Sequence, residues 1–157
     1  MTTLADDEQR LGELAQELGL VATAAIGPWV RGTIGRFLSP EQQDRFARDI
    51  DQAATEAEAD VGSRLEALLG TDVDRQTSSP LAVLRSVVPF AAVVLDRAGI
   101  CAGERDADAR RLHPDDRYDL TPGSFADFGD AVQSAGLSWG AGKAHVHLRR
   151  RREEGAR

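Results

Sequence analysis

Two serine–proline pairs, at Ser39-Pro40 and Ser79-Pro80, are the features that most limit how this chain can fold. A serine side chain accepts a hydrogen bond from the backbone at the start of a helix, and proline suits the first helical position, where no N–H partner is needed. After the first pair, apolar residues recur every three or four positions, while the opposite face is charged or polar. This pattern predicts an amphipathic helix over 40–69 that ends at Gly70.

The second pair predicts another helix, over 80–98, whose residues are apolar on nearly every side. Such a helix is typical of the middle of a bundle. Its β-branched residues leave a strand as the alternative, but the length, the cap and the alanine content favour a helix. Pro89 predicts a bend and Gly99 predicts the end. Because the apolar run contains Arg85 and spans about sixteen residues, short of the roughly twenty that cross a bilayer, we expect no membrane segment.

A stripe of leucines marks the first part of the chain and predicts an amphipathic helix over 4–18 that ends at Gly19. Pro28 predicts a break or kink, before a second apolar face over 29–38. The stripe needs an apolar partner surface, either in this chain or in another copy, so a homo-oligomer is one of our expectations. The stripe consists of Leu4, Leu11, Leu14 and Leu18.

The pattern weakens after Gly99. We expect a short helix over 104–112, a turn at 113–116, and another short helix that starts at Thr121-Pro122 and buries Phe125 and Phe128. The whole chain therefore predicts an all-α protein, a helical bundle of three to four main helices with an irregular C-terminal third. One helical domain is expected over 1–142, followed by a basic, flexible tail at 143–157.

Charge is divided unevenly between the predicted body and tail. Residues 1–142 contain 13 arginines and 24 acidic residues, a net charge of −11, whereas residues 143–157 carry a net charge of +4. An acidic body repels the phosphate backbone, so nucleic acid is expected only at the tail. The same tail also suits an acidic protein surface or the protein's own acidic body. Its binding candidates are Lys143, Arg149, Arg150, Arg151 and Arg152.

The N-terminal residues are acidic and lack the basic start and apolar run of a signal peptide. The single cysteine, Cys101, cannot form an internal disulfide. Both features are typical of a cytoplasmic protein, which is the localisation that we expect.

Motifs for cofactors and catalysis are incomplete. Gly136–Ala144 is similar to a phosphate-binding loop, but its spacing is one residue too long and its last residue has no hydroxyl for magnesium. His145 and His147 would lie on one side of an extended chain, yet no spacing joins them to Cys101 or His113 in the three or four ligands of a zinc site. We therefore expect no cofactor, no metal and no catalytic residue, and lean against an enzyme.

The polar stretch 113–139 is the predicted functional surface. Aromatic and charged side chains in loops are common in binding sites, which singles out Arg111, His113, Tyr118 and Trp139, together with His145 and His147 beyond it. Five aspartates gather nearby, and we expect them to be solvated because little in this stretch would bury them. These are Asp106, Asp108, Asp115, Asp116 and Asp119.

Part of the chain resembles an uncharacterised group of actinobacterial proteins. The resemblance covers under half of the sequence and has no assigned activity, so it implies no catalytic or binding residue. It rests on Ser-Pro-Leu-Ala-Val-Leu-Arg at 79–85, His-Pro-Asp-Asp at 113–116, Tyr-Asp-Leu-Thr-Pro at 118–122, and Leu-Ser-Trp-Gly-Ala-Gly-Lys-Ala-His at 137–145.

The sequence favours a non-enzymatic protein-interaction or regulatory module with a protein partner. One alternative is a small enzyme or ligand-binding domain with a pocket near 113–139. Another is nucleic-acid binding through the tail.

Overall fold

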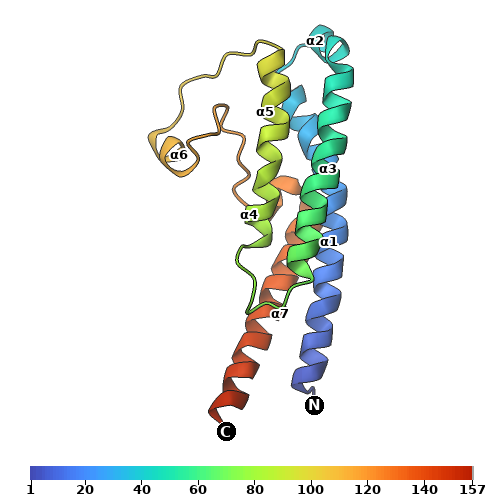
Figure 1. The fold of residues 1–157 in the computed structure, drawn as a ribbon, viewed down its shortest axis with the longest axis vertical. Helices are drawn as coiled ribbons and strands as arrows, with labels where there is room; N and C mark the ends of the chain where they lie inside the picture. Colours follow the sequence, from blue (N-terminus) through green and yellow to red (C-terminus); the bar gives the residue numbers. More distant parts are fainter. Residues whose placement is uncertain (157) are drawn as a thin grey trace.

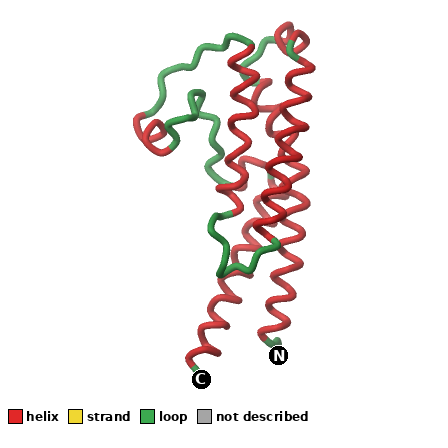
Figure 2. Tube along the Cα trace, viewed as in Figure 1, coloured by secondary structure: helices red, strands yellow, loops and turns green. Residues whose placement is uncertain are grey.

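The computed structural model describes residues 1–156, and all regular structure in them is helical. There are three long helices, and α1 (Leu4–Gly35) packs along both α3 (Ala47–Leu69) and α7 (Asp130–Gly155), in the bundle that Figures 1 and 2 show. The predicted all-α bundle is therefore confirmed. The shorter elements between them are α2 (Pro40–Arg45), α4 (Pro80–Leu84), the 3-10 turn η1 (Arg85–Val87), α5 (Val88–Arg97), α6 (Ala107–Leu112) and the 3-10 turn η2 (Phe125–Phe128).

Both predicted serine caps are present. The Ser39 hydroxyl accepts a hydrogen bond from the backbone N–H of Gln42, and the Gln42 side chain accepts one from the backbone of Ser39. Ser79 caps α4 by accepting from the N–H of Ala82 at 3.1 Å. Each predicted helix is interrupted once, the first at Phe46 between α2 and α3, and the second at η1. The second interruption lies just before Pro89, which has no N–H to donate to the preceding turn.

Helix α1 is continuous from Leu4 to Gly35, so the predicted end at Gly19 and the predicted break at Pro28 are wrong. Pro28 and Ala24 are both exposed, and water can therefore bond the carbonyl that loses its helical partner. A Cβ at Gly19 would lie 3.5 Å from Leu69, so this glycine sits in the contact between α1 and α3. The free energy gained by packing along the whole helix outweighs the local destabilisation of the helix by Gly19 and Pro28.

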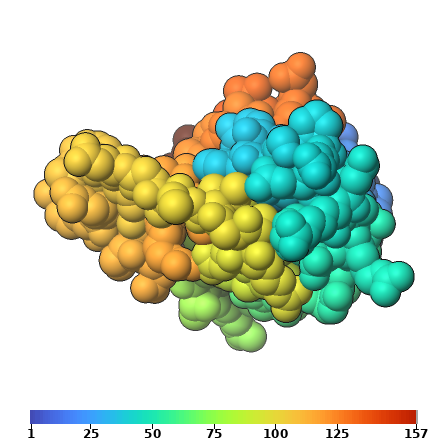
Figure 3. Space-filling model, turned by 90° about the horizontal axis from the view of Figure 1, so that it is seen from above, coloured from blue at the N-terminus to red at the C-terminus, as the bar shows by residue number. Residues whose placement is uncertain are grey.

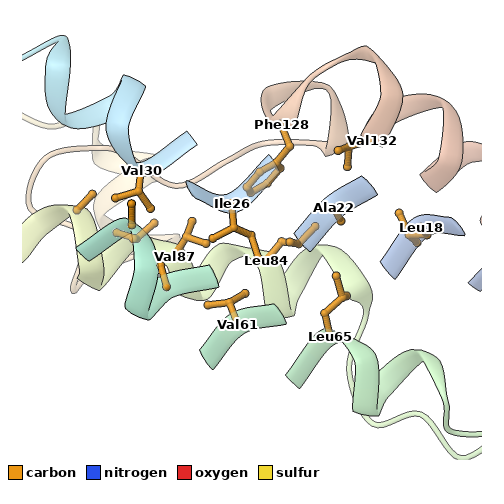
Figure 4. Close-up of a cluster of buried hydrophobic side chains, with 14 of the residues drawn as sticks. Leu18, Ala22, Ile26, Val30, Val61, Leu65, Leu84, Val87, Phe128 and Val132 are labelled. Carbon is orange, nitrogen blue, oxygen red and sulfur yellow. The ribbon is translucent and has the colours of Figure 1, made fainter. Parts of the chain in front are cut away.

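The core follows the middle of α1, where side chains at every third or fourth position are fully buried. They meet buried residues of α3, α4, η1, η2 and α7, which Figure 4 draws together. Three leucines of the stripe expected to need a partner surface, Leu11, Leu14 and Leu18, are buried within the chain, because α1 packs against both α3 and α7, whereas Leu4 is half-buried. The labelled core residues are Leu18, Ala22, Ile26, Val30, Val61, Leu65, Leu84, Val87, Phe128 and Val132.

The chain leaves the bundle between α5 and η2. Figures 1 and 3 show this segment, which contains α6, as a lobe that stands out from the three long helices. The short helix expected over 104–112 is α6, and Phe128 is buried as expected. No helix begins at Thr121-Pro122, however; the next turn starts at Phe125. The Thr121 N–H and hydroxyl both donate instead to the Asp116 carboxylate, at 2.7 and 2.6 Å.

The segment predicted as a flexible tail is the second half of α7. Residues 143–155 continue this helix, and Val146 within them is buried, which corrects the prediction over the described part of the tail. Arg157 of the predicted tail lies outside the described residues. Within residues 1–156, none of the helices has the length and apolar character that crossing a membrane requires.

Candidate functional site

An ionic cluster joins the two ends of the chain. Arg150 on α7 lies at its centre, with its guanidinium 3.0 Å from the Glu8 carboxylate, 2.9 Å from Asp72 and 2.6 Å from Asp74. These acids come from the start of α1 and from the loop between α3 and α4. One arginine therefore ties three separate parts of the chain together. We call the set the terminal cluster: Asp7, Glu8, Asp72, Asp74, His145, His147, Arg149 and Arg150.

The other basic members of the terminal cluster also face acids of the same chain. Arg149 Nε lies 3.2 Å from the Asp7 carboxylate, which His145 Nε2 approaches to 3.1 Å. His147 Nδ1 lies 3.4 Å from Asp74. Of the three partners that the sequence left open for the tail, the one seen here is the protein's own acidic body.

Not all of the predicted tail cations belong to this cluster. The Lys143 ammonium lies 5.2 Å from the centre of the Trp139 ring, in a cation–π contact along α7. Arg151 and Arg152 are exposed.

Arg150 also changes the electrostatics of its acidic neighbours. Its hydrogen bonds lower the pKa of Asp72 and of Asp74 below the usual value for aspartate. Asp72 and Asp74 in turn raise the pKa of the Arg150 guanidinium, so these groups stay charged together. Proton uptake by the two aspartates therefore weakens the terminal cluster.

We expect the stabilisation that Arg150 provides to disappear in acid. The pKa values of Asp72 and Asp74 are lower in the folded than in the unfolded chain, so their contribution is present above the ordinary pKa of about 4 and is lost as pH falls through the folded values. The Arg150→Gln variant should therefore be less stable than wild type at about pH 6, and the difference in free energy of unfolding should shrink below about pH 4.

Urea denaturation at a series of pH values measures this difference. Arg151→Gln removes an exposed neighbour of Arg150 on the same helix and should follow wild type throughout. A deficit in the Arg150→Gln variant that stays constant from neutral to acidic pH would contradict the assignment.

A second region of interest is the projecting loop, residues 99–121, which contains α6. Its organising side chain is Arg105, only 10% exposed although the loop stands outside the bundle. Arg105 Nε donates to the Asp119 carboxylate at 2.7 Å, and Nη2 donates to the carbonyls of His113 at 2.7 Å and Ala109 at 3.1 Å. The guanidinium therefore closes the loop on itself by contacting both α6 and the chain after it.

A buried aspartate fixes the second half of the projecting loop. Asp116 is 5% exposed and accepts hydrogen bonds from the N–H and hydroxyl of Thr121 and from the N–H of Tyr118. Burial alone would raise the pKa of Asp116, but these hydrogen bonds outweigh it and lower the pKa. The expectation that the five neighbouring aspartates are all solvated is therefore wrong for Asp116. A carboxylate held in this way has a structural role, since its oxygens are already occupied.

Tyr118 anchors the projecting loop to the bundle. Its hydroxyl lies 2.6 Å from the Asp96 carboxylate and 3.1 Å from the carbonyl of Ile100, and its ring meets Phe37 edge-on. Burial and the Asp96 carboxylate raise the pKa of Tyr118 to about 12. Arg117 pairs with the same carboxylate. The base of the loop is thus attached both to α5 and to the turn that follows α1.

The tip of the projecting loop exposes an apolar side chain. Leu112, the last residue of α6, is 65% exposed. Arg111 beside it pairs with Asp108 at 3.1 Å, and Arg110 is also exposed. His113 follows the helix and is half-buried. The loop therefore presents leucine among guanidinium groups on a fixed backbone.

A groove lies between α3 and α5, with a volume of about 260 Å³. Its apolar lining includes Ala53 on α3 and Phe90 and Val93 on α5, and Val93 is 46% exposed. Polar residues complete the lining, and two of them, Asp49 and Arg97, pair across the groove at 2.9 Å. The groove thus combines an apolar floor with a charged rim.

A second hollow, of about 200 Å³, lies beside the terminal cluster and is lined by residues that include Leu11, Trp139 and Arg150. Trp139, predicted to lie in a loop surface, is a buried core residue of α7. It is also the one residue of 113–139 that lines either of these two hollows.

The predicted site residues therefore divide into separate places. Arg111, His113 and Tyr118 lie in the projecting loop, whereas the tail residues lie along α7 and partly in the terminal cluster. Sequence reasoning missed Arg105 and Asp96 and misjudged Asp116. Nothing local distinguishes Arg105 from the other arginines of the chain, because its partners are mainly backbone carbonyls.

Among residues 1–156, no group of three or more histidine, cysteine or acidic side chains is arranged to hold a metal ion. Comparison of the chain with protein-family models, curated proteins and solved structures found no significant match. The resemblance to the actinobacterial group stays a prediction.

Proposed function

We propose that this protein is a non-catalytic protein-interaction module whose recognition element is the projecting loop. The observation that carries the proposal is the Arg105 guanidinium, bonded to carbonyls of the loop itself with its side chain only 10% exposed, while Leu112 at the tip is exposed. The loop is fixed by contacts that leave its tip outside the core.

Fixing a loop before it binds favours association. Binding then has a smaller unfavourable entropy, because the backbone and side chains of the loop are already ordered before the partner arrives. Loops held on a rigid scaffold are common binding elements for this reason. The exposed leucine, with Arg111 beside it, supplies an apolar anchor with polar surroundings, as the centre and rim of protein interfaces do.

The contacts of the tail weaken the nucleic-acid hypothesis. Arg149 and Arg150 already lie against Asp7, Glu8, Asp72 and Asp74, so binding phosphate there means breaking ion pairs within the protein. The ligand-pocket hypothesis receives only one contribution from the expected region, namely Trp139 in the hollow beside the terminal cluster.

Affinity capture from a lysate of the native host tests the proposal. We expect proteins retained by the wild-type chain to be lost from a Leu112→Asp variant, because an aspartate cannot fill an apolar pocket on the partner. The matched control is Leu20→Asp, the same change at another leucine, 74% exposed on α1. It should retain the same proteins as wild type.

Circular dichroism and thermal melting of the three proteins show whether each is folded. Equal capture by the wild type, Leu112→Asp and Leu20→Asp would contradict the role of the projecting loop.

A further inference from the structure

We infer that the partner of the projecting loop is a second copy of this chain: Leu112 of one copy enters the groove between α3 and α5 of the other, and Arg111 pairs with Glu56 there. This inference rests on the proposed function, since it uses the same loop. It adds the identity of the partner and the surface that receives the loop.

The apolar floor and wall of the groove suit the apolar side chain at the tip of the loop. Its floor and α5 wall are formed by Ala53, Phe90, Val93 and Val94, with Val93 substantially exposed. An exposed valine beside a hollow loses contact with water when an aliphatic side chain fills it. Leu112 is an aliphatic side chain of this kind and is itself exposed.

The charges around the groove match the charges around the leucine. On the α3 side, Glu56 contributes a carboxylate to the rim of the groove and accepts a hydrogen bond from the neutral Gln52 amide at 2.9 Å. On α6, Asp108 lies three residues before Arg111 and four before Leu112, so these three side chains share one face of the helix. The face that carries Leu112 therefore also carries the Arg111 guanidinium, which exchanges its solvent-exposed pair with Asp108 for one with Glu56.

The groove cannot take the loop of its own chain in this arrangement. Figure 1 shows α6 on one side of α5 and α3 on the other, and the view from above in Figure 3 agrees. The tip of the loop therefore points away from the groove that its own α3 and α5 form. A second copy supplies a groove that the tip can enter.

A twofold arrangement uses both loops and both grooves. In a twofold dimer every contact occurs twice, once from the first copy to the second and once from the second copy to the first. Each copy then gives its loop and receives one, which doubles the buried apolar surface. The Arg111–Glu56 pair occurs twice.

Sedimentation equilibrium over a range of concentrations measures self-association. We expect the wild-type chain to approach the mass of a dimer as concentration rises. Leu112→Asp and Arg111→Glu should each weaken the dimer by about tenfold or more, because the first puts a charge into the groove and the second opposes two carboxylates. Arg110→Glu is the matched control, since Arg110 lies on another face of α6, and it should dimerise more strongly than Arg111→Glu.

Exchanging the two charges shows whether Arg111 and Glu56 contact each other directly or whether the single variants act only by changing the net charge of the chain. The chain that carries both Arg111→Glu and Glu56→Arg should regain most of the dimerisation lost in either single variant, since each pair is then restored with reversed signs. A monomeric wild-type chain at every concentration would overturn the inference. So would a dimer indifferent to Leu112→Asp, or a double variant no stronger than its parents.

Cross-linking tests the placement itself. In a Cys101→Ser background, which removes the single native cysteine, a Leu112→Cys chain mixed with a Val93→Cys chain should give an interchain disulfide on mild oxidation. Peptide mass spectrometry should find residue 112 joined to residue 93. A Leu20→Cys chain mixed with the Val93→Cys chain should give little of this product, and equal yields in both mixtures would overturn the placement.

The two proposals fail in different ways. A chain that stays monomeric but still loses its captured proteins on Leu112→Asp contradicts only the second copy as partner. A chain that neither self-associates nor loses captured proteins on Leu112→Asp contradicts both proposals.

Discussion

Replacing Ile26 with alanine is expected to lower the free energy of unfolding by about 2–5 kcal/mol. Ile26 is fully buried in the middle of α1, and Figure 4 places it within the cluster formed by several helices. The substitution removes methyl and methylene groups from a site where α1 meets α3, α4 and η1, so the cavity cannot close by moving one helix alone. Urea denaturation with linear extrapolation measures the loss.

The control for this prediction is Leu20→Ala on the same helix. Leu20 is largely exposed, and its truncation should change the free energy of unfolding by no more than about 0.5 kcal/mol. If both variants lose the same stability, the effect comes from helix propensity and not from burial, and the central position of Ile26 in the core is wrong.

The parts of the fold that follow from local chemistry were predictable. The hydroxyls of Ser39 and Ser79 accept from N–H groups three residues away, so the local sequence is enough to predict both caps. The continuity of α1 through Pro28 was not predictable in this way. It depends on the packing of both halves of the helix against α3 and α7, which are distant in sequence.

Helix α7 shows how composition can mislead. Its glycines and its arginines suggest a flexible basic end, yet three apolar residues at intervals of seven, Val132, Trp139 and Val146, are buried along one side of the helix. This spacing was present in the sequence and was the signal for a helix that packs on α1. Gly136 on the same side allows the Phe125 ring to lie where a Cβ would be only 2.4 Å away.

The candidate site was predictable in position but not in its organisation. The stretch after residue 113 does contain loop residues with specific contacts, including Tyr118. Arg105 was missed because its role depends on the path of the backbone after α6, which brings the carbonyls of Ala109 and His113 to one guanidinium. A pattern of side chains cannot reveal a site whose ligands are mostly backbone atoms.

Replacing Arg105 with methionine is expected to release the projecting loop while the bundle stays folded. The change keeps a side chain of similar length but removes the donors to Asp119 and to the carbonyls of His113 and Ala109. Hydrogen bonds that involve a charged group contribute about 1.5–3 kcal/mol each, so the local free energy of opening should fall by several kcal/mol. Hydrogen exchange followed by mass spectrometry should show loss of protection over 105–121 and little change in α1 and α3.

Arg110→Met is the control, because it removes an exposed arginine from the same short helix and should leave exchange in the loop unchanged. The Arg105→Met variant also tests whether binding needs only the residues of the loop tip or needs them held in a fixed conformation. It retains Leu112 and Arg111 but no longer holds them in place, so partner capture and self-association should weaken even though every residue of the proposed contact is present. Undiminished binding by a loop whose amides exchange freely would show that a fixed backbone is not what recognition requires.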